Sequence, residues 1–172
     1  YHEPKAVSTK CARILVLSPT RELAGQIHDS FGAYGRYINV RRTTIFGGVS
    51  SQGQIKAMAR GVDVLVATPG RLLDLINQGR VCLDEVDAFV LDEADRMLDM
   101  GFEPQIRSII TQIRPDRQTL FWSATWPKEV QNLAKEFLTN FYEVHVGSLD
   151  LRANTAITQV VEILNTDFEK YN

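Results

Sequence analysis

Long apolar runs, paired cysteine motifs and clustered histidines are all missing from this chain of 172 residues. No segment approaches the length of a membrane span, and the first residues lack the charged-then-apolar order of a signal peptide. Cys11 and Cys82 stand in no Cys-x-x-Cys pattern, and the three histidines have no ligand spacing. The sequence therefore indicates neither a disulfide framework nor a zinc site. We expect two buried thiols in a soluble, intracellular protein that does not enter a membrane.

The composition predicts one domain with a core, since 44% of the residues are hydrophobic and 23% are charged. The net charge of −2 conceals an asymmetry between the two halves of the chain. Residues 1–80 hold 11 Lys and Arg against 5 Asp and Glu, whereas residues 81–172 hold 8 against 16. A basic half suggests contact with a polyanion and an acidic half suggests a metal-holding centre, although such blocks are more often solvated faces.

Short apolar runs alternate with amphipathic segments along the chain. The runs predict six strands, with one further β-like run at the end, over 13–17, 42–46, 62–67, 86–91, 118–122, 142–146 and 157–164. Short loops between strands and helices imply a mostly parallel sheet with helices on both faces, an α/β fold.

Several residues mark where the helices begin and end. Thr20 and Thr68 are expected N-caps, the latter followed by Pro69 at the first helical position, and Ser51 with Gln54 matches a capping box. Gly79 is expected to end the third helix. A longer helix is expected around 104–113, and Pro127 is expected to start the last one.

Three carboxylates within four residues follow the strand over 86–91. Asp92, Glu93 and Asp95 would lie at the carboxyl end of a buried strand, where open α/β sheets bind their ligands. Two adjacent carboxylates suit a hard cation and an attacking water. An acidic helix start is the plainer alternative, but Asp92 directly follows apolar residues rather than a turn.

Polar or glycine-containing segments follow all five of the first strands, and parallel strands bring such segments to one edge of the sheet. They are 18–21, 47–48, 68–71, 92–95 and 123–125. Each taken singly is explained by a cap, a turn or a polar strand end. Together they offer helix N-termini, glycines that permit close backbone approach, and two arginines, which is a surface for phosphates. Such contacts position a nucleic acid strand without reading its sequence.

These segments, in this order, resemble the DEAD-box RNA helicases. The matching motifs are Pro19-Thr20-Arg21-Glu22-Leu23, Gly47-Gly48, Thr68-Pro69-Gly70-Arg71, Asp92-Glu93-Ala94-Asp95 and Ser123-Ala124-Thr125. Residues 96–107 and 114–119 resemble the large nuclear subgroup involved in transcription-linked RNA remodelling. The resemblance implies the first of two RecA-like domains, ATP-dependent local unwinding of RNA duplexes, and a place in the nucleus or cytoplasm.

The resemblance also implies residue roles. Asp92 would hold Mg²⁺ through water, Glu93 would polarise the water that attacks the γ-phosphate of ATP, and Asp95 would bond the hydroxyls of Ser123 and Thr125. The RNA sugar-phosphate backbone would lie along Pro19, Thr20, Arg21, Gly48, Thr68, Gly70 and Arg71. The 2′-hydroxyl would select RNA over DNA.

One family motif is missing: no Lys follows a Gly, so the phosphate loop G-x-x-x-x-G-K-[ST] does not occur in the chain. We therefore expect an internal piece of a longer protein, with a partial RecA-like domain over 1–147 and a tail over 148–172 that approaches the interdomain linker. Without the strand that carries the loop, we expect uncovered core faces and strand edges. The alternatives are an RNA-binding or partner-docking module without turnover, and a DNA helicase of the same superfamily.

Overall fold

The computed structural model describes residues 11–146, 158 and 160 of the chain. Two compact units are present, over 1–139 and 140–172, and the first holds the regular secondary structure described here. Among the helices of the described residues, none combines the length and the apolar composition that crossing a bilayer requires.

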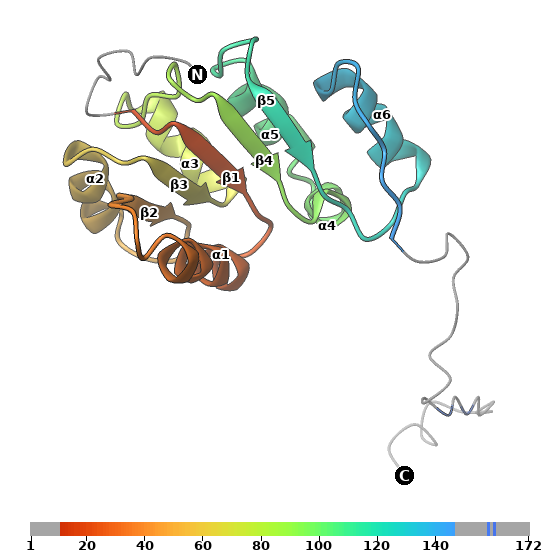
Figure 1. Cartoon of the computed structure of the whole chain (residues 1–172), viewed down its shortest axis with the longest axis horizontal. Coiled ribbons are helices and arrows are strands. Elements are labelled where there is room, and N and C mark those ends of the chain that lie inside the picture. The colour runs from red at the N-terminus through yellow and green to blue at the C-terminus, as the bar shows by residue number, and fades with distance from the viewer. Residues whose placement is uncertain (1–10, 147–157, 159, 161–172) are drawn as a thin grey trace, which may run out of the picture. The chain divides into compact units, whose positions relative to one another are not determined.

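Five short strands form one parallel sheet in the order β2-β3-β1-β4-β5 (Figure 1). The strands are β1 Ile14–Leu17, β2 Arg42–Ile45, β3 Val64–Ala67, β4 Ala88–Leu91 and β5 Gln118–Phe121. All four strand pairs are parallel. The sheet confirms the predicted α/β fold class, and each strand lies within its predicted range, with fewer residues at the ends.

Six helices connect or follow these strands. They are α1 Arg21–Tyr34, α2 Ser51–Ala59, α3 Pro69–Asn77, α4 Ala94–Asp99, α5 Glu103–Ile110 and α6 Lys128–Phe137. The helix expected over 104–113 is shorter than predicted and is preceded by α4, because Gly101 takes a positive φ of 75° between the two. Gly79 also has positive φ and lies just beyond α3, as expected.

The predicted helix caps have mixed outcomes. The Thr20 hydroxyl accepts a hydrogen bond from the Leu23 amide at 3.2 Å, which confirms this N-cap. Thr68 stands at the N-cap of α3 but makes no capping bond with its side chain. The capping box was wrong: Ser50, one residue earlier, accepts from the Gln52 amide, and Gln54 instead donates to the Phe46 carbonyl at 3.0 Å.

The two faces of the sheet are covered unequally. Side chains alternate along each strand, so Leu15 and Leu17 join the larger buried cluster while Val16 joins a smaller one. Every helix from α2 to α6 contributes to the larger cluster, whereas the smaller cluster is covered by α1. In Figure 1, α1 lies in front of the sheet and α3 and α5 behind it. The expected helices on both faces are present, but one face carries a single helix.

Cys11 and Cys82 form a disulfide with their Cα atoms 5.5 Å apart, which corrects the expectation of two buried thiols. Sequence spacing of 71 residues gave no sign of this pairing. The fold produces it because β1 and β4 are neighbours, and the amides of Asp87 and Ala88 both donate to the Arg13 carbonyl at their entry ends. Cys11, three residues before β1, is thereby brought beside Cys82 in the segment that leads into β4.

The sixth predicted strand, over 142–146, is also wrong, since these residues form no regular structure. Tyr142, Val144 and Val146 have 97%, 80% and 97% of their surface exposed. Alternating apolar residues form a strand only when a neighbouring strand accepts their backbone hydrogen bonds, and the described part of this unit supplies none. The β-like run over 157–164 and the tail over 148–172 fall almost wholly outside the described residues.

Candidate functional site

The candidate site begins with the alignment of the five strand ends. Ile45, Ala67, Leu17, Leu91 and Phe121 are successive partners in register across the sheet. Backbone hydrogen bonds continue this alignment one residue further: Thr68 N to Ile45 O, Ser18 N to Ala67 O, Asp92 N to Leu17 O and Trp122 N to Leu91 O, all 2.8–3.0 Å. The segments singled out in the sequence therefore leave the sheet side by side at its carboxyl edge.

Asp92 and Glu93 occupy different environments although they are adjacent. The Asp92 side chain is partly buried, and this burial raises the pKa of its carboxyl, with a smaller opposing effect from the Glu93 backbone. A carboxylate in such a position gains from a nearby cation, because the cation replaces the water that burial has removed. A cation beside Asp92 would therefore stabilise the ionised form of its carboxyl.

Glu93 lies in the left-handed region, with φ 54° and ψ 52°, and is exposed to solvent. A residue other than glycine rarely adopts this backbone conformation, and such strain gathers at functional sites. Two anchors hold it: the next amide, Ala94 N, donates to Trp122 O at 3.0 Å, and Glu93 O accepts from Met97 N. Glu93 thus stands at the N-cap of α4 in a left-handed conformation, and its side chain makes no capping hydrogen bond.

Asp95 is bound to the segment after β5. Its Oδ2 accepts hydrogen bonds from the Thr125 hydroxyl at 2.7 Å and the Thr125 amide at 2.9 Å. Ser123 takes part differently from the expectation: its hydroxyl accepts from the Asp95 amide at 3.3 Å and donates to the Thr125 carbonyl at 2.8 Å. Burial works to raise the pKa of Asp95, but hydrogen bonds led by that of the Thr125 hydroxyl outweigh it and hold the pKa below its ordinary value.

The residues expected to contact phosphates form a second group on this edge. Gly48 has a φ of 80°, and a Cβ there would lie 3.7 Å from the Arg21 guanidinium. Arg71 donates from Nη1 to the Val49 carbonyl at 3.0 Å, so both arginines meet the glycine loop after β2. Arg21 also pairs with the exposed Glu22 at 2.6 Å, a surface contact that a phosphate can replace at little cost.

Thr20, Thr68 and Gly70 complete this group at the starts of α1 and α3. The N-terminus of α1 points its first amides and positive dipole end to the edge, next to Pro19 and Thr20. Gly70 leaves space toward the Phe102 ring, whose nearest atom would lie 4.0 Å from an added Cβ. The structure thus brings the phosphate-contact residues to one edge, and Asp92 and Asp95 to the same edge one strand further on.

The acidic turn offers a carboxylate to Mg²⁺, whereas the chain lacks the motif that holds ATP. Residues 11–146 contain no group of three or more His, Cys, Asp or Glu side chains that is able to enclose a metal. The partly buried Asp92 carboxylate fits Mg²⁺ as one ligand through water, which is how this ion is held beside substrate phosphates. The chain does not fit ATP by itself, because the loop that cradles its phosphates is missing from the sequence.

Sequence reasoning missed three groups that shape the site. The carbonyls of Trp122 and Val49 anchor the acidic turn and Arg71, but any residue supplies a carbonyl, so no sequence signal marks them. Gln54, with 9% of its surface exposed, ties α2 to the segment that leads into the glycine loop. A polar residue on the apolar side of an amphipathic helix was a usable signal for Gln54.

Comparison with known proteins gives one family and a set of close relatives. Residues 5–133 match the family model of the DEAD/DEAH box helicases. The chain is 60% identical over 152 residues to the ATP-dependent RNA helicase DBP2 of Chaetomium thermophilum, covering 88% of this chain and 27% of that protein. It is 59% identical over the same length to the Neurospora crassa protein of that name, with the same coverage. The Emericella nidulans protein is 57% identical over 157 residues, which are 91% of this chain and 28% of that protein. The chain thus spans little more than a quarter of each relative.

Proposed function

The chain belongs to the DEAD/DEAH box helicase family, and from that premise we propose that it is part of an ATP-dependent RNA helicase that couples hydrolysis to local unwinding of RNA duplexes. The observation that carries the proposal is the link between the acidic turn and the segment after β5. There Asp95 accepts two hydrogen bonds from Thr125. This link is what a motor needs to pass the state of a nucleotide site to another part of the protein.

In this proposal Asp92 would hold Mg²⁺ through water, and the ion would supply charge neutralisation at the phosphates. Glu93 would orient and deprotonate the attacking water. This chain supplies the two carboxylates but not the loop that holds the nucleotide, so it would bind ATP only together with a phosphate loop supplied from outside these 172 residues. By itself we expect it to be inactive.

RNA is proposed to lie along Pro19, Thr20, Arg21, Gly48, Thr68, Gly70 and Arg71. The proximity of Gly48 to Arg21 and of Arg71 to Val49 supports one continuous track. Backbone amides and guanidinium groups bind phosphate whatever the base, so binding would be independent of sequence. The 2′-hydroxyl would then select RNA.

The wider organisation is proposed on the same basis. Residues 1–147 would form part of the first RecA-like domain, and residues 148–172 would approach the linker to a second such domain. The hydrogen bonds of Asp95 would transmit the state of the nucleotide site to that second domain. The protein would act in the nucleus or the cytoplasm. The second candidate, an RNA-binding or partner-docking module without turnover, is favoured by one observation, the missing phosphate loop.

The test uses a protein that contains this segment together with a phosphate loop. Glu93→Gln should cut RNA-stimulated ATP hydrolysis by about 10²- to 10⁴-fold, since it removes the proton acceptor and keeps the shape of the side chain. RNA binding should be unchanged. The matched control is Glu129→Gln, which changes an exposed acid in the first turn of α6. Hydrolysis by the variant near the wild-type rate would leave Glu93 without a catalytic role.

Substitutions in the proposed RNA contacts distinguish the helicase from the module without turnover. Arg21→Ala and Arg71→Ala should weaken RNA binding evenly across sequences and reduce its salt dependence under either candidate. Only the helicase should also lose RNA-stimulated hydrolysis. A DNA helicase would respond to DNA as strongly as to RNA.

A further inference from the structure

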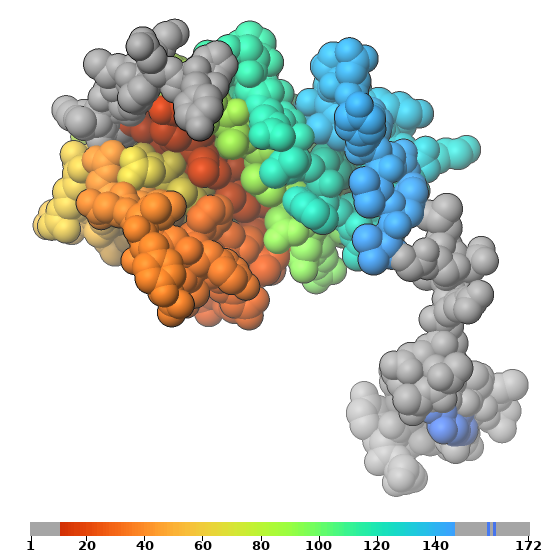
Figure 2. Space-filling view, in the orientation of Figure 1, coloured from red at the N-terminus to blue at the C-terminus, as the bar shows by residue number. Residues whose placement is uncertain are grey.

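The turn that follows α1 exposes large side chains far from the proposed catalytic edge. Tyr34, Tyr37 and Ile38 have 89%, 83% and 67% of their surface exposed. Isolated exposed apolar residues are ordinary, but two tyrosines and an isoleucine within five residues form a patch. The turn leads from the C-terminus of α1 back to the entry of β2, so the patch lies near the amino-terminal edge of the sheet. In Figure 2 this orange segment lies on the face turned to the viewer.

The charge of this turn is of one sign. Residues 33–42 contain three arginines and no acid. Arg41 pairs with Asp63 at 2.7 Å, and Arg42 donates from Nε to the His28 carbonyl at 3.1 Å. Within residues 11–146, Arg36 makes no ion pair, and its Cζ lies 4.6 Å from the centre of the Tyr37 ring. The guanidinium of Arg36 therefore stays available to an anion while it lies against an aromatic face.

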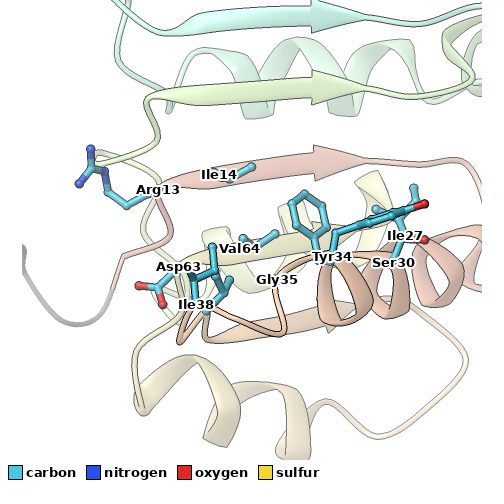
Figure 3. Close-up of a pocket in the computed structure, with 11 residues that line it drawn as sticks. Arg13, Ile14, Ile27, Ser30, Tyr34, Gly35, Ile38, Asp63 and Val64 are labelled. Atoms are coloured by element: carbon cyan, nitrogen blue, oxygen red, sulfur yellow. The ribbon is translucent and has the colours of Figure 1, made fainter. Parts of the chain in front are cut away.

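An apolar hollow of about 490 Å³ lies beside Tyr34 and Ile38. Its walls come from α1, the following turn and the entries of β1 and β3, and include Ile27, Phe31, Tyr34, Ile38 and Val64. In Figure 3 Tyr34 lies along α1 and Arg13 points away from the hollow. The hollow is large enough for a small planar group, and Tyr34 offers a ring face at its rim.

We propose that this surface, called here the tyrosine turn and made of Tyr34, Arg36, Tyr37 and Ile38, is a second contact for single-stranded RNA. Bases stack on the tyrosine rings, and Arg36 binds the phosphate between them. Exposed aromatic rings interleaved with unpaired positive charge are the means by which single strands are bound without sequence preference. The inference rests on the proposed function, because it takes RNA as the ligand.

RNA is favoured over a protein partner by the charge of the turn. A protein that fills an apolar hollow gains nothing from an unpaired arginine unless it brings a carboxylate, whereas every nucleotide brings a phosphate and a ring together. The tyrosine turn also lies at the opposite end of α1 from Arg21. The 14 residues of α1 separate the two ends by roughly 20 Å. At the stacked rise of about 3.4 Å per nucleotide, a strand of about 5 nucleotides is shorter than this distance and one of about 15 is longer.

The test uses a protein that contains this segment together with a phosphate loop, and compares its affinity for unstructured RNAs of about 5 and about 15 nucleotides by fluorescence anisotropy. Tyr34→Ala combined with Tyr37→Ala should weaken binding of the longer RNA by about 5- to 100-fold and leave the shorter RNA unaffected. Arg36→Gln should lower the salt slope for the longer RNA by about one. Tyr34→Phe combined with Tyr37→Phe should retain affinity, since stacking needs the ring and not the hydroxyl. Tyr142→Ala removes a tyrosine that is 97% exposed beside Glu143 and should change nothing.

The outcomes separate the inference from the proposed function. Equal effects of the tyrosine variants on both RNAs, or no effect on the longer one, would overturn the tyrosine turn while Arg21→Ala still weakened the shorter RNA. Absence of RNA binding at both lengths in the unaltered protein would overturn the proposed function and this inference together. The melting temperatures of the variants should match that of the parent, because the altered side chains are mostly exposed.

Discussion

The Thr125 side chain and backbone both donate to one oxygen of Asp95, at 2.7 and 2.9 Å, across the 30 residues that separate them. This pair joins the acidic turn after β4 to the segment after β5. A change in the position of either segment must therefore move or break the pair, which makes it the best candidate for a coupling element.

The first prediction concerns this pair. Ser123→Ala with Thr125→Ala, in a protein with a phosphate loop, should leave ATP hydrolysis in place and reduce duplex unwinding, because the substitution leaves Asp92 and Glu93 unchanged. Both activities are to be measured at one temperature. The control is Thr111→Ala. It removes a hydroxyl at the C-cap of α5 that donates to the Ser108 carbonyl. If the two hydroxyls were only structural, both activities would fall in parallel with a stability loss of roughly 0.5–1.5 kcal/mol per lost hydrogen bond.

The second prediction is that the two aspartates respond to pH with opposite sign. Asp92 has a raised pKa in the folded state, so its ionisation costs stability at neutral pH, and Asp92→Asn should raise the melting temperature at pH 7. Asp95 has a lowered pKa, so its stabilising effect is present above the ordinary value of about 3.9 and is lost as the pH falls through the lower, folded value. Asp95→Asn should therefore lower the free energy of unfolding at pH 7 by about 1 kcal/mol, and the melting temperature with it.

Thermal unfolding of both variants at pH 7 and at a pH below both pKa values checks this. At the acidic pH both carboxyls are protonated in the folded and in the unfolded state. The melting temperatures of both variants should therefore lie closer to that of the parent. Shifts of the same sign at pH 7 would contradict the opposite environments of the two groups.

The third prediction concerns the disulfide. It closes a loop of 71 residues between Cys11 and Cys82, so its reduction should cost about 2–4 kcal/mol of stability through the greater freedom of the unfolded chain. Melting with and without a thiol reductant measures this. Cys82→Ser should melt at the temperature of the reduced parent and should not respond to the reductant. A parent that melts at one temperature under both conditions would show that the bond does not form in solution.

The fourth prediction is that the isolated chain self-associates. Within the described residues β5 pairs only with β4, and next to this edge Leu120 and Trp122 have 42% and 60% of their surface exposed. An unpaired strand edge with exposed apolar side chains offers a template for another chain. Analytical ultracentrifugation should show dimers or larger species at micromolar concentration. Leu120→Lys should restore the monomer, whereas a monomeric parent with a sharp, reversible melt would contradict the prediction.

Some features were readable from the sequence because they depend on local chemistry. The short apolar runs predicted β1 to β5, and Thr20 was recognised as a cap because a threonine before an amphipathic run satisfies the first free amides. The run over 142–146 misled for the same reason: its pattern suits a strand, but a strand needs a neighbour that local sequence does not contain. The capping box failed by one residue, since Ser50 and Ser51 have equal capacity to cap and the entry angle of the chain decides between them.

The sequence by itself determined the fold class, the order of the motifs and their common edge, because strand and helix periodicity together with the right-handed parallel connection leave few arrangements. Only the tertiary structure decided which groups meet. The disulfide, the bond from the Asp95 amide to Ser123 and the contact of Arg71 with Val49 each join residues that lie far apart in the chain, and sequence separation carries no information about their distance in space. The left-handed conformation of Glu93 is likewise visible only in the structure. Packing of the strands in the order β2-β3-β1-β4-β5 brings these residues together, and that order is set by the burial of whole faces rather than by any single residue.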